Sequence, residues 1–250
     1  MEWSDCGLVL SARRHGERDA ILEVMTAEHG RHLGLVRGGR GPRHSAMLQP
    51  GNRVSLTWRA RLEEHLGAFS VEPLVSRAAY IINNALALHA VSHLAQLLRL
   101  MPERQAHTHV YEAADALCAL AGEPLHLAPM LVRFELLILS ELGFGLDLTE
   151  CAATGTALNL AYVSPKSGRA VSRDAGAPWA EKLLTLPHFL TIDGEERETP
   201  ISSEEMEAAF RLTAFFLDRH VFEPRGMGAS QARSTFVTLF LERRKEERQR

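Results

Sequence analysis

The sequence is poor in cysteine, the residue that forms disulfides and binds most structural zinc. Its 250 residues include only three cysteines, Cys6, Cys118 and Cys151, whose spacing makes neither a disulfide framework nor a C-x-x-C motif. Such sparse cysteine use is typical of the reducing cytosol, so we expect a cytoplasmic protein. We expect no secretory signal and no membrane span, because no apolar run reaches about 18 residues and no basic segment precedes one at the N-terminus.

Common catalytic signatures are missing as well. There is no G-x-x-x-x-G-K-[ST], no H-E-x-x-H and no G-x-S-x-G. His89 and His93 lie one turn apart on an expected helix, but no carboxylate or cysteine completes a metal site there. His107 and His109 are interpreted as ordinary helix-surface or partly buried histidines. We therefore expect no enzymatic activity, no cofactor and no metal.

The composition and the pattern of apolar residues indicate a globular α+β protein in two unlike parts. The hydrophobic fraction is 46% and the charged fraction 24%, which suits a chain with a substantial core. Residues 1–75 contain five short apolar or alternating runs separated by turn signals, and they predict strands at 7–12, 21–26, 32–37, 53–58 and 68–71. Five strands in so short a stretch favour a small barrel, and an SH3-like barrel and an OB-fold both fit.

From residue 76 to 250 the pattern becomes mainly helical. Apolar residues recur every three or four positions over 82–101 and 110–120, and a further helix is expected to begin at Pro129 and close at Gly143. Ser202 and Glu205 fit a capping box for a helix to about residue 221, and a last helix is expected over about 230–245. Glycines and prolines interrupt the pattern over about 148–200 and predict an irregular loop insertion.

The charge distribution is more informative than the net charge of -3. Residues 31–61 contain seven arginines and no aspartate or glutamate. The arginines are Arg31, Arg37, Arg40, Arg43, Arg53, Arg59 and Arg61. We expect Arg37, Arg40 and Arg43 to cluster on the glycine-rich loop at 38–41, where the backbone can approach a ligand closely. A concentrated positive field of this kind binds phosphate backbones, and arginine adds bidentate geometry.

The strand expected at 53–58 sharpens this interpretation. Val54, Leu56 and Trp58 fall on one face, and Arg53 and Arg59 fall on the other. The first face would enter the barrel core, so we expect Trp58 to be a core residue and not a base-stacking platform. The basic face predicts a nucleic-acid interface. Two alternatives stay open: a solvated basic face without a partner, and an adaptor whose barrel binds an acidic protein segment.

Several motifs, in this order and spacing, resemble the RecO family over nearly the whole chain. They are G-E-R-D-A-I-L at 16–22, T-A-E-H-G at 26–30, V-R-G-G-R-G at 36–41, L-Q-P-G at 48–51, R-F-E-L at 133–136, L-G-F-G at 142–145 and Y-V-S-P-K-S-G at 162–168, followed by the stretch 212–234. The resemblance implies an N-terminal OB-fold over 1–75 and a helical domain over 76–250. It also implies binding of single- and double-stranded DNA, annealing of complementary strands, and loading of recombinase onto SSB-coated DNA in RecF-pathway repair. The implied partner is RecR, and the implied location is the cytoplasm near the nucleoid.

Two further expectations follow from the resemblance. Many members carry a four-cysteine zinc site after the L-G motif, but here only Cys151 remains and Thr154 stands at the second position, so we expect no zinc. Packing would then hold the loop, with Tyr162 and Trp179 as candidate anchors. The helical domain is expected to bind the acidic C-terminal tail of SSB, for which Arg133, Phe134 and Leu137 offer a cation beside an apolar stripe. Alternatively, Arg133 pairs with a surface acid.

Overall fold

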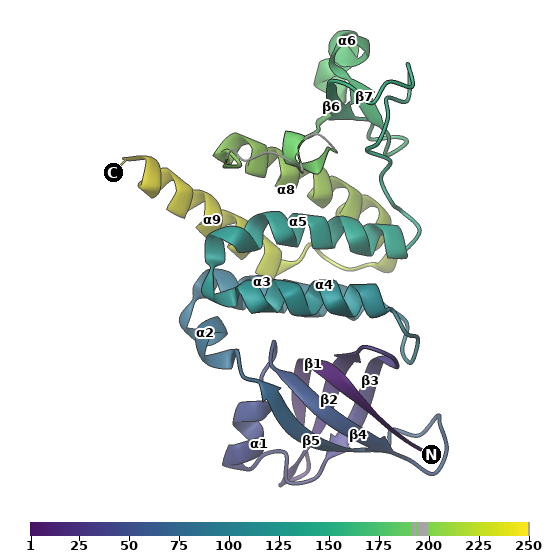
Figure 1. The fold of residues 1–250 in the computed structure, drawn as a ribbon, viewed down its shortest axis with the longest axis vertical. Helices are drawn as coiled ribbons and strands as arrows, with labels where there is room; N and C mark the ends of the chain where they lie inside the picture. Colours follow the sequence, from purple (N-terminus) through teal and green to yellow (C-terminus); the bar gives the residue numbers. More distant parts are fainter. Residues whose placement is uncertain (192–193, 195–199, 250) are drawn as a thin grey trace. The chain divides into compact units, whose positions relative to one another are not determined.

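The chain is described by a computed structural model that covers residues 1–191, 194 and 200–249. The side chains at positions 43, 124, 125, 248 and 249 lie outside the description. Two compact units share the chain, Met1–Leu127 and Ala128–Arg250. We call the first the barrel unit and the second the helical unit. Figure 1 shows the strands gathered in the first part of the chain and helices prevailing in the rest, which confirms the predicted α+β class.

The barrel unit begins with five strands that close into a barrel in the order β1-β2-β3-β5-β4. Their bounds are β1 Glu2–His15, β2 Asp19–Thr26, β3 Gly30–Val36, β4 Arg53–Arg59 and β5 Ala68–Val75. All five predicted strands are present. Alternate residues point inward, and the interior packs around Leu22, Val24, Val54, Leu56 and Trp58, each at most 1% exposed. The barrel form that the sequence predicted is therefore confirmed.

Strand β1 is longer than predicted because it pairs with two neighbours. Its first half, from Glu2 to Leu8, is antiparallel to β4, and its second half, from Gly7 to His15, is antiparallel to β2. The register with β2 shifts between Val9 and Ser11. Such a bulge increases the local twist and re-aims the side chains that follow.

The glycine-rich loop ends at Gly41, because a helix follows it directly. Helix α1 (Pro42–Met47) has Pro42 in its first turn, where the fixed φ and the missing N–H of proline cost nothing. Arg43 therefore lies in α1 and not on the loop, and its side chain lies outside the described residues. Figure 1 shows α1 beside the barrel.

The barrel unit continues into helices. Their bounds are α2 Ala78–Asn83, α3 Ala85–Leu98, α4 Thr108–Ala119 and the short 3-10 turn η1 Leu120–Gly122. The sequence predicted one helix over 82–101, but the chain breaks at Asn84. This residue has an extended backbone, and its side chain accepts a hydrogen bond from the amide of Ala87, so it caps α3.

The helical unit contains most of α5 (Pro124–Glu141), together with α8 (Ser203–Leu217) and α9 (Gln231–Gln249). Pro129 lies inside α5, so the prediction that it begins a helix is wrong. The turn before it is helical as well, and proline at position 124 occupies the first position instead. The predicted capping box is confirmed, since Ser202 and Glu205 bond reciprocally. A π-helical turn η4 (Asp218–Phe222) and a 3-10 turn η5 (Glu223–Arg225) follow α8.

The predicted loop insertion contains a small antiparallel sheet in the order β7-β6-β8. Its elements are β6 Leu160–Val163, β7 Ala170–Ser172, α6 Arg173–Gly176, η2 Ala177–Lys182, β8 Leu184–Thr185 and η3 His188–Leu190. Tyr162 packs tightly over Gly176, where an added Cβ would lie 2.4 Å from its ring. Trp179 is 59% exposed and is not an anchor, because the 3-10 turn that carries it lies at the surface. Residues 192–193 and 195–199 of the predicted insertion lie outside the described residues.

Candidate nucleic-acid interface

The alternation predicted for β4 holds in the barrel. Val54, Leu56 and Trp58 are buried, whereas Arg59 is exposed at the end of the strand. The indole N–H of Trp58 donates to the backbone oxygen of Leu66 at 3.0 Å. Trp58 is therefore a core residue, as expected, and its ring is not available to stack on a nucleobase.

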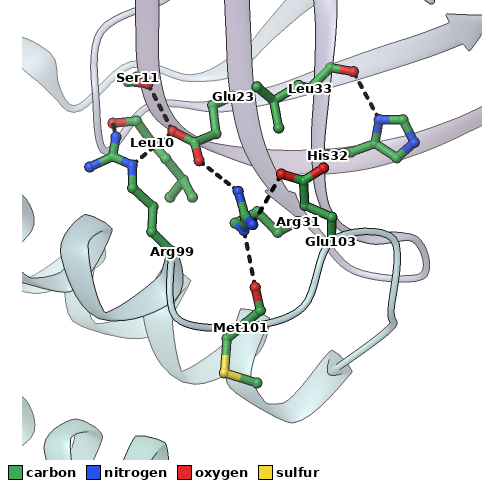
Figure 2. Close-up of polar contacts among 9 residues, drawn as sticks. All are labelled: Leu10, Ser11, Glu23, Arg31, His32, Leu33, Arg99, Met101 and Glu103. Carbon is green, nitrogen blue, oxygen red and sulfur yellow. Dashed lines mark hydrogen bonds and ion pairs between the residues drawn. The ribbon is translucent and has the colours of Figure 1, made fainter. Parts of the chain in front are cut away.

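Arg31 belongs to a partly buried ion-pair cluster, as Figure 2 shows. Its Nη1 lies 3.0 Å from Glu23 Oε1, its Nη2 lies 3.2 Å from Glu103 Oε1, and its Nε donates to the Met101 oxygen at 3.1 Å. Arg99 Nε donates to the other oxygen of Glu23 at 2.8 Å. Only 14% of the Arg31 side chain is exposed. The cluster thus ties β2 and β3 to the segment between α3 and α4.

The electrostatics of Glu23 explain why this cluster forms. Burial acts to raise the pKa of its carboxyl group, but hydrogen bonds and charge from Arg99, with further bonds from Ser11 and Arg31, outweigh burial and hold the pKa below its ordinary value. Glu23 is therefore a buried carboxylate that needs its arginines. Arg31 is one of these partners, and the contacts that the structure gives its guanidinium group lie within the barrel unit.

Arg53 is also engaged inside the barrel unit. Its Nη1 lies 2.8 Å from one oxygen of Asp115 on α4, and Arg77 Nη1 lies 2.6 Å from the other oxygen. Asp115 is thus shared by two arginines from different elements. The window free of carboxylates in the sequence is accordingly not free of them in space, because Glu23, Glu103 and Asp115 come from other parts of the chain.

Four arginines of the predicted set are exposed on the barrel: Arg37, Arg40, Arg59 and Arg61. Arg59 Nη2 lies 2.9 Å from Glu2, but both side chains are more than half exposed, and such a pair is easily exchanged for a phosphate. Arg40 Nη1 donates to the backbone oxygens of Gly16 and Glu17 at 3.1 and 2.6 Å. These bonds fix the Arg40 side chain against the turn between β1 and β2.

Two of these arginines, Arg37 and Arg59, line an open groove of about 640 Å³. We call it the strand groove, and its polar and aromatic lining comprises Arg37, His44, Thr57, Arg59, Phe69 and Ser70. No aspartate or glutamate is among the described residues that line it. Phe69 is only 5% exposed, so the groove offers cations and hydroxyl groups and no free aromatic face. This chemistry suits a phosphate backbone better than a stacked base.

A second hollow of about 380 Å³ also borders the segment that runs from Val36 to Pro50. We call it the hairpin groove, and its polar lining comprises Ser11, Arg13, Arg14, Arg40, Ser45 and Gln49. Arg13 and Arg14 were not predicted from the sequence as site residues. The available signal was a pair of consecutive arginines just before a turn. It was overlooked because Glu17 and Asp19 follow closely, so this segment is not free of acids as residues 31–61 are.

The structure places the proposed SSB-tail residues on α5 in the helical unit. Arg133 Nη2 donates to the Phe189 oxygen at 3.0 Å, and its guanidinium carbon lies 5.5 Å from the centre of the Phe189 ring. Leu137 is half-buried one turn along the same face. Phe134 is 3% exposed and packs into the interior, so a surface contact now depends on Arg133 and Leu137. Among the residues that the structure describes, the hydrogen bond and the cation–π contact of Arg133 are both with Phe189, and neither is with an acid.

Cys151, the remaining cysteine of the degenerate loop, is buried. Burial acts to raise the pKa of its thiol, but hydrogen bonds from Ser172, Thr154 and the Ala153 amide outweigh it and lower the pKa to about 6. Across the described part of the chain, no three histidine, cysteine, aspartate or glutamate side chains come together as a metal site requires. In the same residues, no helix has the length and apolar character to cross a bilayer.

Two family models match successive parts of the chain. Residues 1–77 match the family described as Recombination protein O N terminal, and residues 83–227 match Recombination protein O C terminal. The chain is 55% identical over 242 residues to the DNA repair protein RecO of Chelativorans sp. (strain BNC1), covering 96% of each chain. It is 54% identical over 241 residues to the DNA repair protein RecO of Methylobacterium nodulans, covering 96% of this chain and 98% of the relative.

Proposed function

Because this chain belongs to the RecO family of DNA repair proteins, we propose that it is a non-enzymatic DNA-binding mediator of recombination whose barrel holds the phosphate backbone. The observation that carries this proposal is the strand groove. Arg37, His44 and Arg59 line it, its described lining residues include no carboxylate, and the net charge of the chain is -3. Local concentration of cations in a hollow attracts a polyanion and releases its counterions.

The proposed DNA contacts are Arg37, Arg40, Arg59 and Arg61, with Arg43 added by its sequence position alone. Arg31 and Arg53 were expected in the same set, but the contacts above favour a role in holding the barrel to α3 and α4. Because the proposed contacts are to phosphate oxygens and not to base edges, binding is expected to be nearly independent of sequence and to extend to single and double strands. In the cell this activity would serve annealing of complementary strands and loading of recombinase onto SSB-coated DNA, with RecR as partner, in the cytoplasm near the nucleoid.

The test is a titration of single- and double-stranded DNA at several salt concentrations with the double variant Arg37→Ala and Arg59→Ala. Loss of two phosphate contacts should lower the slope of log affinity against log salt by about two units and weaken binding to all sequences alike. The matched control is Arg173→Ala with Arg211→Ala, which removes two exposed arginines from the helical unit. An unchanged slope in the barrel variant would contradict the assignment. Stronger binding of an acidic peptide than of DNA would favour the adaptor alternative.

We also propose that Arg133 and Leu137 bind the acidic C-terminal tail of SSB. A terminal carboxylate needs a cation and an apolar residue needs a neighbouring apolar surface, and α5 presents both one turn apart. The change Arg133→Glu should abolish binding of a tail peptide and leave binding of naked DNA intact, since the DNA contacts are proposed on the barrel. Fluorescence anisotropy with each labelled ligand measures the two activities. Equal loss of both would contradict separate sites, and Arg173→Glu is the charge-matched control.

A further inference from the structure

We propose that the hairpin groove is a second phosphate-binding groove, which holds a second nucleic-acid strand beside the one in the strand groove. This inference rests on the proposed DNA binding by the barrel and deepens it. Both grooves border the segment from Val36 to Pro50. That segment gives Arg37 and His44 to the strand groove, and it gives Arg40 and Ser45 to the hairpin groove.

The hairpin groove takes its other cations from β1. Arg13 and Arg14 come after the register shift between Val9 and Ser11, in the part of β1 that pairs with β2. Both side chains are exposed, and both line the groove. With Arg40 they make three arginines in one hollow, and no aspartate or glutamate is among its described lining residues. Three guanidinium groups with neighbouring hydroxyl and amide groups match the oxygens of a phosphate backbone.

The wall that carries Arg40 is fixed before any ligand binds. The Arg40 amide donates to the Arg18 oxygen at 3.0 Å, and the Gly38 amide donates to Asp19 Oδ1 at 2.8 Å. At Gly39 the backbone lies so close to β2 that an added Cβ would be 2.8 Å from the Cβ of Ala20. The loop is thus held against the β1–β2 hairpin, and little conformational freedom is lost when a phosphate docks there.

Two separate grooves that border one cationic segment suit two strands better than one. Two phosphate backbones repel each other at close range, and the arginines between them offset this repulsion. An acidic protein segment would also be attracted to the hairpin groove, but two cation-lined hollows sharing one segment favour a pair of like polymers. Holding two strands side by side on one barrel brings complementary bases together, which is the geometric requirement for annealing.

The test compares the full chain with the double variant Arg13→Ala and Arg14→Ala. Native mass spectrometry with a short non-complementary oligonucleotide, at low salt, should show two strands per wild-type chain and one per variant chain. Stopped-flow fluorescence should show annealing of complementary strands slowed on the order of tenfold in the variant, since two phosphate contacts to one strand are lost. Binding of the first strand should be unaltered, and the control variant Arg173→Ala with Arg211→Ala should behave as wild type.

A wild-type chain that binds only one strand, or a variant that anneals at the wild-type rate, would overturn the second groove while leaving the barrel's DNA binding in place. Failure of the wild type to bind any DNA would instead remove the proposed function. Displacement of only the second strand by a polyglutamate peptide of equal charge would identify an acidic protein as the occupant and overturn the inference. If the alanine variant unfolds, the same measurements are made with Arg13→Gln and Arg14→Gln, which keep the polar stems and lose the charge.

Discussion

Changing Arg31 to alanine separates the arginines that hold the barrel together from those proposed to bind DNA. The guanidinium group of Arg31 bonds to Glu23, to Glu103 and to the Met101 oxygen. Loss of the charge-assisted bond to the nearly buried Glu23 costs about 1.5–3 kcal/mol, and the bond to the Met101 oxygen adds about 1 kcal/mol. The Glu103 side chain is half exposed, so its pair adds little. Glu23 keeps Arg99 and Ser11, so the total stays near 3 kcal/mol, below the upper range for breaking a fully buried pair.

The assay is urea unfolding of the full chain followed by tryptophan fluorescence. Trp3 and Trp58 lie in the barrel and Trp179 lies in the helical unit, so the exposed Trp179 is first changed to phenylalanine. The Arg31→Ala variant should lose about 3 kcal/mol of unfolding free energy, whereas Arg61→Ala, at an exposed position, should stay within about 0.5 kcal/mol of the parent.

DNA affinity measured well below the unfolding transition decides the interpretation. The Arg31→Ala variant should bind DNA with the parent's affinity and salt slope, because its side chain is enclosed. The opposite pattern, with full stability and a salt slope reduced by about one unit, would show that Arg31 contacts phosphate and that its ion pairs open readily. That result would refute the structural role assigned here.

Two other predictions concern a buried histidine and the degenerate loop. The pKa of His32 lies below its ordinary value of 6.5, chiefly because the ring is buried, with the positive charge of Arg104 adding to the effect and the bond to the Leu33 oxygen opposing it. The unfolded chain therefore takes up a proton near pH 6.5 that the folded protein binds only at lower pH, so stability is full above this pH and falls below it. Urea unfolding at pH 7.5 and 5.5 should show a smaller loss in His32→Gln than in the parent, and equal losses would contradict this assignment. Elemental analysis should find no stoichiometric zinc, and a chelator should leave the melting temperature unchanged; one tightly bound zinc per chain would show that Cys151 has ligands beyond the hydrogen-bonding groups around it.

The sequence predicted the features that depend on local periodicity. The alternation of Val54, Leu56 and Trp58 with polar residues is a property of one strand, and it identified both the core face and the basic face of β4. The capping box at Ser202 and Glu205 is equally local, since its two bonds join residues three apart. In each of these cases the deciding interactions lie within a few residues of the signal.

Interactions between distant segments could not be predicted in the same way. The partners of Arg31 and Arg53 include Glu103 and Asp115, which are separated from them by more than sixty positions in the sequence. The lack of acids in residues 31–61 therefore overstated how much positive charge is left without an acidic partner in the folded protein. Arg13 and Arg14 show the converse, because the acids that follow them in sequence do not line the groove they share with Arg40. Pro129 lies inside α5 although proline is favoured in the first turn of a helix, so its position alone did not locate the helix start.

The attachment of the barrel to the segment after α3 has a practical consequence for dissecting the protein. Arg99, Glu103 and Asp115 complete ion pairs with barrel residues, and an added Cβ at Gly30 would lie 1.9 Å from the backbone oxygen of Gln105. A recombinant fragment cut at the end of β5 would lose all of these partners and leave Glu23 with Arg31 and Ser11 alone. The smallest piece that retains the barrel's own contacts extends through α4. The OB-fold of this chain is thus one part of a larger cooperative unit, and its strands and the helices that follow them are expected to unfold together.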